Sequence, residues 1–159
     1  MLVEGPPQRW DAETELLLIV AARRTHLVET IWPALERGEW VVCDRFADST
    51  LAYQGYGRGL PRAALEALHV LIAPNFKPDL TLILDLPVEA GFARAGARAE
   101  GVSRFERLGR EFHERLRRGY QEIAKAEPAR CVLIDASAEL TAVQEAIKAV
   151  VRTRLGIAL

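Results

Sequence analysis

The sequence of 159 residues has two cysteines, almost no net charge and no long apolar run. Cys43 and Cys131 show no CxxC or clustered Cys/His spacing, so we expect neither a disulfide framework nor a metal site, and predict two reduced, buried thiols. The formal net charge of −1 predicts no general attraction to nucleic acid or to a membrane. No apolar stretch approaches the roughly 20 residues that span a bilayer. The first residues do not resemble a secretory signal, and we expect a cytoplasmic protein.

Hydrophobic residues make up 50% of the chain, enough for one domain with a core over residues 1–159. Apolar spacings of three, four and seven predict helices over residues 11–37, 61–72, 88–98, 106–125 and 140–154. Continuous apolar runs predict strands, buried on both faces, over residues 40–44, 79–87 and 130–137. Alternating helices and strands predict an α/β fold with a parallel sheet between two layers of helices.

The first predicted helix has a broad apolar stripe, made by Leu16, Val20, Leu27, Ile31, Leu17, Ala21, Val28 and Leu35. Asp11 is a plausible N-cap, and Gly38 is a natural residue just past the C-terminal end. Pro33 is expected to kink or restart the helix near Trp32, because proline has no N–H to donate.

Charged residues follow the predicted strands at their carboxyl ends. Asp44 and Arg45 end the first strand, Asp85 lies near the end of the second and Asp135 near the end of the third. Ligands of open parallel sheets bind beyond these ends. The sequence therefore predicts a site around Asp44 and Arg45.

The stretch after this strand, CDRFADSTLAYQGYGRG, has groups suited to a nucleotide. The planar fork of Arg45 matches a phosphate, and Asp44 can hold the guanidinium, orient a metal-bound water or accept a proton. Ser49 adds a hydroxyl, while Tyr53 and Gln54 can close over a sugar or base. Residues alone leave a second interpretation open, an ordinary strand-end ion pair followed by turn glycines.

This stretch resembles the Asp-Arg-aromatic…Ser…Ala-Tyr-Gln signature of the thymidylate kinase family, among the P-loop nucleoside monophosphate kinases. Three further segments resemble the family in the same order, namely ETELLLIVAARRTHLVETIWPALERGEWVVCDR, KPDLTLILDLPVE and SRFERLGREFHERLRRGYQEIAKAEPARCVLIDAS. The resemblance covers residues 2 to about 150. It implies a three-layer α/β/α fold and transfer of the γ-phosphoryl group of ATP to dTMP, with Mg²⁺ as cofactor and a possible homodimer.

The resemblance also assigns roles. Arg45 is expected to bind the dTMP phosphate, with Asp44 organising that phosphate and a metal-bound water. Arg24 matches an arginine that hydrogen-bonds thymine, and Tyr53 an aromatic that packs on the deoxyribose. Ser49 and Gln54 match residues lining the nucleotide pocket.

A lid segment is expected at about residues 94–110, where Arg98 and Arg104 match the region that closes on the ATP phosphates. Residues 101–118 carry six arginines against three glutamates. A charged helix of this kind is usually a solvated surface, and Arg104 in the matched SRFE segment is the arginine expected to act on phosphate.

The sequence departs from the family in three ways. It has no G-x-x-x-x-G-K-[ST] run and no Gly-Lys dipeptide, so Met1 is expected to begin inside the family pattern, after its first two strands and the P-loop, about 50 residues by the size of a βαβ unit. Val20 stands where a phenylalanine usually stacks on thymine. Ser103 stands where an acid commonly precedes the arginine.

Two alternatives to a thymidylate kinase stay open at this point. Without the loop that cradles ATP, the chain alone is expected to have little or no kinase activity. One alternative is therefore a protein that binds a nucleoside monophosphate without turnover. The other is a kinase for a different nucleoside monophosphate, suggested by Val20.

Overall fold

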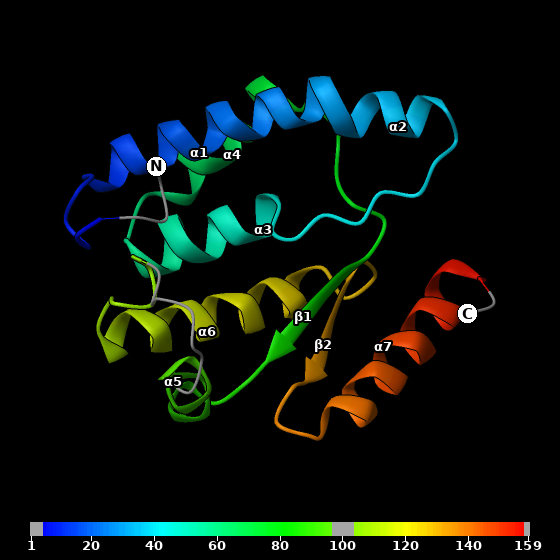
Figure 1. Ribbon diagram of the computed structural model, residues 1–159. Coiled ribbons are helices and arrows are strands. Elements are labelled where there is room, and N and C mark those ends of the chain that lie inside the picture. Colours follow the sequence, from blue (N-terminus) through cyan, green and yellow to red (C-terminus); the bar gives the residue numbers. More distant parts are fainter. Residues whose placement is uncertain (1–4, 97–103, 158–159) are drawn as a thin grey trace. The chain divides into compact units, whose positions relative to one another are not determined.

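The structure is a computed structural model that describes residues 5–96 and 104–157 (Figure 1). The chain divides into two compact units. The first comprises Met1–Lys77 and Ser103–Leu108, and the second comprises Pro78–Val102 and Gly109–Leu159. A single domain stays a prediction, and each unit is described by itself below.

The first unit begins with a helical run that changes its winding twice. Helix α1 spans Ala12–His26, a π-helical turn η1 spans Leu27–Ile31, and helix α2 spans Trp32–Glu36. Asp11 caps α1, accepting a 2.7 Å hydrogen bond from the Thr14 N–H. The restart at Trp32 confirms the expected effect of Pro33, which lies in the first turn of α2. Gly38 follows the run with a φ of 76°, as expected of a residue past a helix end.

The predicted apolar stripe of this run divides into a buried and an exposed half. The buried half joins the core of the unit, which contains Leu16, Val20, Leu27, Ile31, Phe46, Leu65, Ile72 and Ala73. The other half is largely exposed, at Leu17, Val28 and Leu35. The core thus lies along one face of the helical run.

The prediction of a doubly buried strand over residues 40–44 is wrong. These residues form no strand, and the exposed fraction of the Val42 side chain is 99%. Val41 and Cys43 pack against the core cluster from one side only. A strand needs a neighbour to pair its N–H and C=O groups, and none of the described residues of the first unit supplies one.

The stretch after Arg45 is helical. Helix α3 spans Ala47–Thr50 and passes into a second π-helical segment, η2, over Leu51–Gly57. Gly55 allows close packing here, because a Cβ would lie 3.3 Å from Leu51 Cδ1 and 3.5 Å from Leu65 Cδ2. Helix α4, Arg62–Ile72, then follows, as predicted.

The second unit contains the sheet. Strand β1 spans Thr81–Asp85 and pairs in parallel with strand β2, Cys131–Asp135. Helix α6, Arg110–Ala126, contacts both strands, and helix α7, Leu140–Leu155, contacts β2 (Figure 1). Helix α5, Val88–Gly96, follows β1 and contacts α6. Helices around a parallel pair confirm the α/β class.

The register places the two strand-end acids side by side, since Asp85 is the partner of Asp135. Arg117 holds Asp85 through two hydrogen bonds, of 2.8 and 2.9 Å. These bonds outweigh partial burial and hold the pKa of Asp85 below its usual range. The prediction that both acids end parallel strands at one sheet edge is confirmed. Neither cysteine is in a disulfide, and no helix within 5–96 or 104–157 is long and apolar enough to cross a bilayer.

The exposure of Val42 leads to a first prediction. Val42→Ala should change the free energy of unfolding by less than about 0.5 kcal/mol, because the side chain loses no buried contact. The same substitution at Val20, which is 7% exposed, should cost about 1.5 kcal/mol. Urea unfolding of both variants measures the difference. Equal losses would mean that residues 40–44 are buried after all.

Candidate functional site

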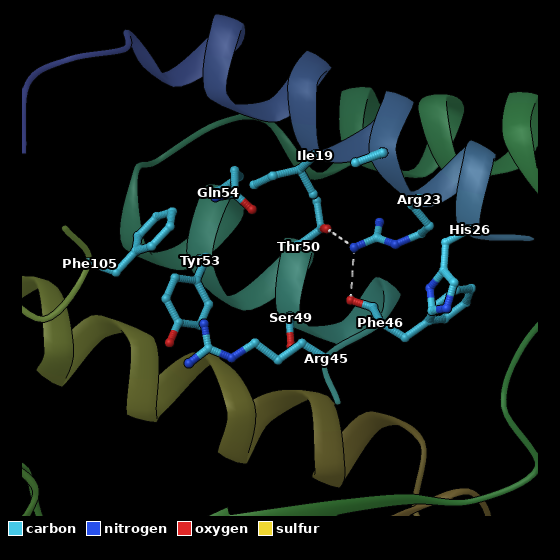
Figure 2. A pocket seen from close by; sticks show the side chains of 11 residues that line it. Ile19, Arg23, His26, Arg45, Phe46, Ser49, Thr50, Tyr53, Gln54 and Phe105 are labelled. Atoms are coloured by element: carbon cyan, nitrogen blue, oxygen red, sulfur yellow. Dashed lines mark hydrogen bonds between the residues drawn. The ribbon is translucent and has the colours of Figure 1, made fainter. Parts of the chain in front are cut away.

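A pocket of about 300 Å³ lies in the first unit, between α1 and the helical stretch α3–η2 (Figure 2). It is lined by Ile19, Ala22, Arg23, His26, Arg45, Phe46, Ser49, Thr50, Tyr53, Gln54 and Phe105. The lining combines aromatic and aliphatic walls with a few cationic and hydroxyl groups. Pockets of this size and composition are typical of small-molecule sites.

One face of α1 forms a wall of the pocket, because Ile19, Arg23 and His26 follow one another at helical spacing. Arg23 Nη2 donates hydrogen bonds to Thr50 Oγ1 at 2.6 Å and to the Phe46 carbonyl oxygen at 3.0 Å. Its guanidinium also lies over the Phe46 ring, 5.2 Å from the centroid. Burial lowers the pKa of Arg23 from its usual value. An arginine side chain nevertheless stays charged in proteins, so the pocket has a fixed cation. Figure 2 shows these bonds joining α1 to α3.

Arg45 enters the pocket from a strained backbone. Its φ is 66°, in the left-handed region that residues with a side chain rarely occupy. From there the side chain runs along the pocket to Tyr53 (Figure 2), where the guanidinium lies 4.9 Å from the ring centroid. Burial raises the pKa of Tyr53, partly offset by Arg45, so the phenol stays neutral at physiological pH. Strain of this kind at a pocket points to a functional constraint.

A buried carboxylate supports the wall formed by Gln54 and Phe105. Glu15, in the first turn of α1, is fully buried, and its Oε1 accepts a 2.9 Å hydrogen bond from Gln54 Nε2. Its Oε2 accepts a hydrogen bond from Arg58 Nη2, also at 2.9 Å, and another from Arg104 Nη2. Three segments distant in the sequence therefore meet at one side chain.

Arg104 is as deeply buried as its partner. Its Nη1 donates to the Pro7 carbonyl oxygen at 3.1 Å, and its guanidinium lies 4.4 Å from the centroid of the Phe105 ring. The Phe105 ring in turn meets Tyr53 edge to face, with centroids 5.4 Å apart. The buried ion pair and the pocket thus share a wall.

The electrostatics of Glu15 follow from these contacts. Burial alone would raise the pKa of this carboxyl, but hydrogen bonds from Arg58, Gln54 and Arg104 outweigh burial and hold the pKa below its usual range. Glu15 is therefore ionised at neutral pH in the folded protein.

The structure brings together some of the predicted site residues and not others. Arg45, Ser49, Tyr53 and Gln54 all line the pocket. Asp44 is exposed next to Arg45 but is not part of the lining.

Arg24 points away from the pocket, donating a 2.8 Å hydrogen bond to the Ile72 carbonyl oxygen and lying over the Trp32 ring. Arg104 is in the ion pair with Glu15 and does not line the pocket. Arg98 lies outside the described residues. Val20, compared above with a base-stacking phenylalanine, is in the core, and Ile19 lines the pocket instead.

Sequence reasoning missed Arg23, Phe105 and the role of Glu15. Arg23 had no signal of its own, because the helical spacing that places it on one face with Ile19 marks neither residue as lining a pocket. The role of Glu15 had no local signal, because an acid in a first helical turn is ordinarily explained by the helix dipole. Within 5–96 and 104–157, no group of three or more His, Cys, Asp or Glu side chains is placed to hold a metal ion.

The chain is similar to thymidylate kinases in both sequence and structure. A family model described as thymidylate kinase matches residues 4–147. The thymidylate kinase of Caulobacter vibrioides is 55% identical over 157 residues, which are 99% of this chain and 75% of that protein. That of Jannaschia sp. is 50% identical over 155 residues, which are 98% of this chain and 74% of that protein. The crystal structure of thymidylate kinase from Ehrlichia chaffeensis superposes with a TM-score of 0.68 at 34% identity, covering 89% of this chain and 66% of that one.

The ion pairs of Glu15 lead to a second prediction. Glu15→Gln should lower the free energy of unfolding at pH 7 by about 3 kcal/mol, because it leaves a buried arginine without its counter-charge. The pKa of Glu15 is lowered by folding, so its contribution is complete above the unfolded value of about 4.3 and is lost as the pH falls through the folded value.

Urea unfolding at pH 7 and at pH 3 tests this dependence. The difference between wild type and Glu15→Gln should shrink at pH 3, because the Glu15 carboxyl of the unfolded wild-type chain is protonated there and the folded state loses part of its advantage. Glu13→Gln is the matched control on the same helix turn, because Glu13 is exposed. A difference that is equal at both pH values would contradict an ionised, paired Glu15.

The left-handed backbone of Arg45 leads to a third prediction. At an ordinary site glycine is less stable than alanine by about 0.5–1 kcal/mol, but at positive φ the Cβ is strained by about 1–2 kcal/mol. Arg45→Gly should therefore be more stable than Arg45→Ala, by up to about 1 kcal/mol. Arg62, exposed in α4, should show the opposite order for the same two substitutions. Thermal unfolding of the four variants decides the sign.

Proposed function

The chain belongs to the thymidylate kinase family, and we propose that its pocket binds dTMP for ATP-dependent phosphorylation to dTDP. The observation that carries the proposal is the convergence of arginines, hydroxyls and aromatic rings in one pocket of the first unit. A nucleoside monophosphate needs these elements, namely a cation for its phosphate and apolar walls for its sugar and base.

Arg45 is proposed to bind the phosphate. It is exposed at the mouth of the pocket, and its guanidinium stacks on Tyr53. A stacked guanidinium keeps its N–H groups in a fixed plane, from which it can donate two parallel hydrogen bonds to an oxyanion. Ser49, in α3, also lines the pocket and adds a hydroxyl.

Tyr53 is proposed to pack on the deoxyribose, and Gln54 to line the nucleotide pocket next to it. Arg23 is the arginine of α1 that lies in the pocket, and we assign to it the contact with the base that the family resemblance suggested for Arg24. Its bonds to Thr50 and to the Phe46 carbonyl hold the guanidinium in place before a ligand arrives. Such preorganisation reduces the entropy lost on binding.

ATP and Mg²⁺ complete the proposed reaction. Mg²⁺ usually keeps several waters and binds through one or two carboxylates and substrate phosphates. Asp44, exposed next to Arg45, has the chemistry for this role and for organising the acceptor phosphate. A role for Arg104 at the ATP phosphates stays a prediction, and it would require the guanidinium to leave Glu15. Arg98 stays a prediction as well.

The cellular setting is also a proposal. The thiols of Cys43 and Cys131, neither of them in a disulfide, suit a reducing compartment such as the cytoplasm. A homodimer stays a prediction.

The fourth prediction tests the proposed function by calorimetric titration with dTMP and with thymidine, which lacks the phosphate. Arg45→Ala should weaken dTMP binding about 30-fold, the equivalent of about 2 kcal/mol for a charge-assisted hydrogen bond. It should leave thymidine binding nearly unchanged, since the rest of the pocket is intact. Arg62→Ala, a change at an exposed arginine on α4, is the control and should behave as wild type.

Equal losses for both ligands would contradict a phosphate contact at Arg45. Formation of dTDP from dTMP and ATP by the same protein would support phosphoryl transfer. Tight dTMP binding without dTDP would favour the alternative of a nucleotide-binding protein without turnover, and tighter binding of another nucleoside monophosphate would favour the other acceptor.

A further inference from the structure

Glu15 is a buried ionised group that the proposed reaction does not use. Among the residues that line the pocket, Gln54 donates a hydrogen bond to Glu15. Its other partners, Arg58 and Arg104, lie outside the lining. A fully buried carboxylate is costly to retain, so its retention calls for an explanation beyond stability.

The contacts of Glu15 lead to the pocket by two routes. The first is Gln54, whose side chain is 1% exposed and whose amide is oriented by the bond to Glu15 Oε1. The second is Arg104, which precedes Phe105 and lies over its ring. Phe105 then meets Tyr53, the residue on which Arg45 stacks.

We propose that Glu15 is a positioning residue that builds the Tyr53–Phe105 wall of the nucleotide pocket by anchoring Arg104. The turn formed by residues 104–108 reaches this wall from a distant part of the sequence, 89 residues from Glu15 to Arg104. An anchored turn holds the Phe105 ring against Tyr53 before the ligand binds. The inference rests on the proposed function, because it assigns the pocket to dTMP.

The anchoring has a consequence in the ligand-free protein. Trypsin cleaves after an arginine only when the side chain is accessible, and the Arg104 side chain is fully buried. Loss of the Glu15 charge should release the turn, so cleavage after Arg104 should be about tenfold faster in Glu15→Gln, through more frequent local opening. Mass spectrometry of the fragments identifies this cleavage, and Glu13→Gln should match wild type.

The effect on the ligand is tested by a double-mutant cycle. Glu15→Gln and Phe105→Ala should each weaken dTMP binding about tenfold, and together also about tenfold, because both remove the same wall. A merely structural role of Glu15 would add its effect to that of Phe105→Ala and give about a hundredfold loss. The folded state of each variant is checked by circular dichroism. Arg104→Lys, which keeps the charge but loses the planar fork, replaces Glu15→Gln if that variant is unfolded.

The outcomes separate this inference from the proposed function. Additive losses, or a folded Glu15→Gln that binds dTMP as wild type does, overturn the positioning role. Wild-type protein that binds no dTMP overturns the proposed function, and the rate of cleavage after Arg104 then decides the inference alone. Cleavage that is no faster in Glu15→Gln overturns it, whatever the ligand data show.

Discussion

The first unit depends on one buried negative charge. A carboxylate removed from water must have its oxygens satisfied, and Glu15 accepts from Gln54, Arg58 and Arg104. These partners come from η2, from the residue that follows it and from the distant 104–108 turn. Satisfying the charge therefore fixes the start of α1 against both segments. The pocket lies beside this junction because Gln54 and Phe105 belong to its walls.

Arg45 has the opposite effect on the free energy of the folded state. The Glu15 network lowers the free energy of the folded state, whereas the left-handed backbone of Arg45 raises it. The strain is tolerated because α3 begins two residues later and Phe46 is fixed in the core. The guanidinium lies over the ring of Tyr53, and the same ring meets Phe105 at nearly a right angle. The ring of Tyr53 is thus contacted by the strained Arg45 and by Phe105, the residue next to Arg104 of the Glu15 network.

Much of the fold could be predicted from the sequence, because apolar spacing reports the helical period directly. The spacing does not report which half of a broad stripe is buried, and Leu17 and Val28 are exposed while Leu16 and Leu27 are in the core. The same ambiguity affects which residues of a helix are expected to line the site. One residue corresponds to about 100° around a helix axis, so Arg23 lines the pocket while the neighbouring Arg24 donates to the Ile72 carbonyl instead. A role for Arg24 at the base stays a prediction.

The wrong strand and the unpredicted ion pair have a common physical cause. Both depend on a partner that is distant in the sequence. The run WVVCD has the composition of a buried strand, but a strand exists only with a hydrogen-bonded neighbour, and Val42 is exposed where none is described. Glu15 and Arg104 each look like ordinary surface charges of a helix or a charged segment. Their partnership is specified only when the chain brings them together across 89 residues. Local patterns therefore predicted residues that line the pocket, such as Arg45 and Tyr53, better than the residues that contact them from behind.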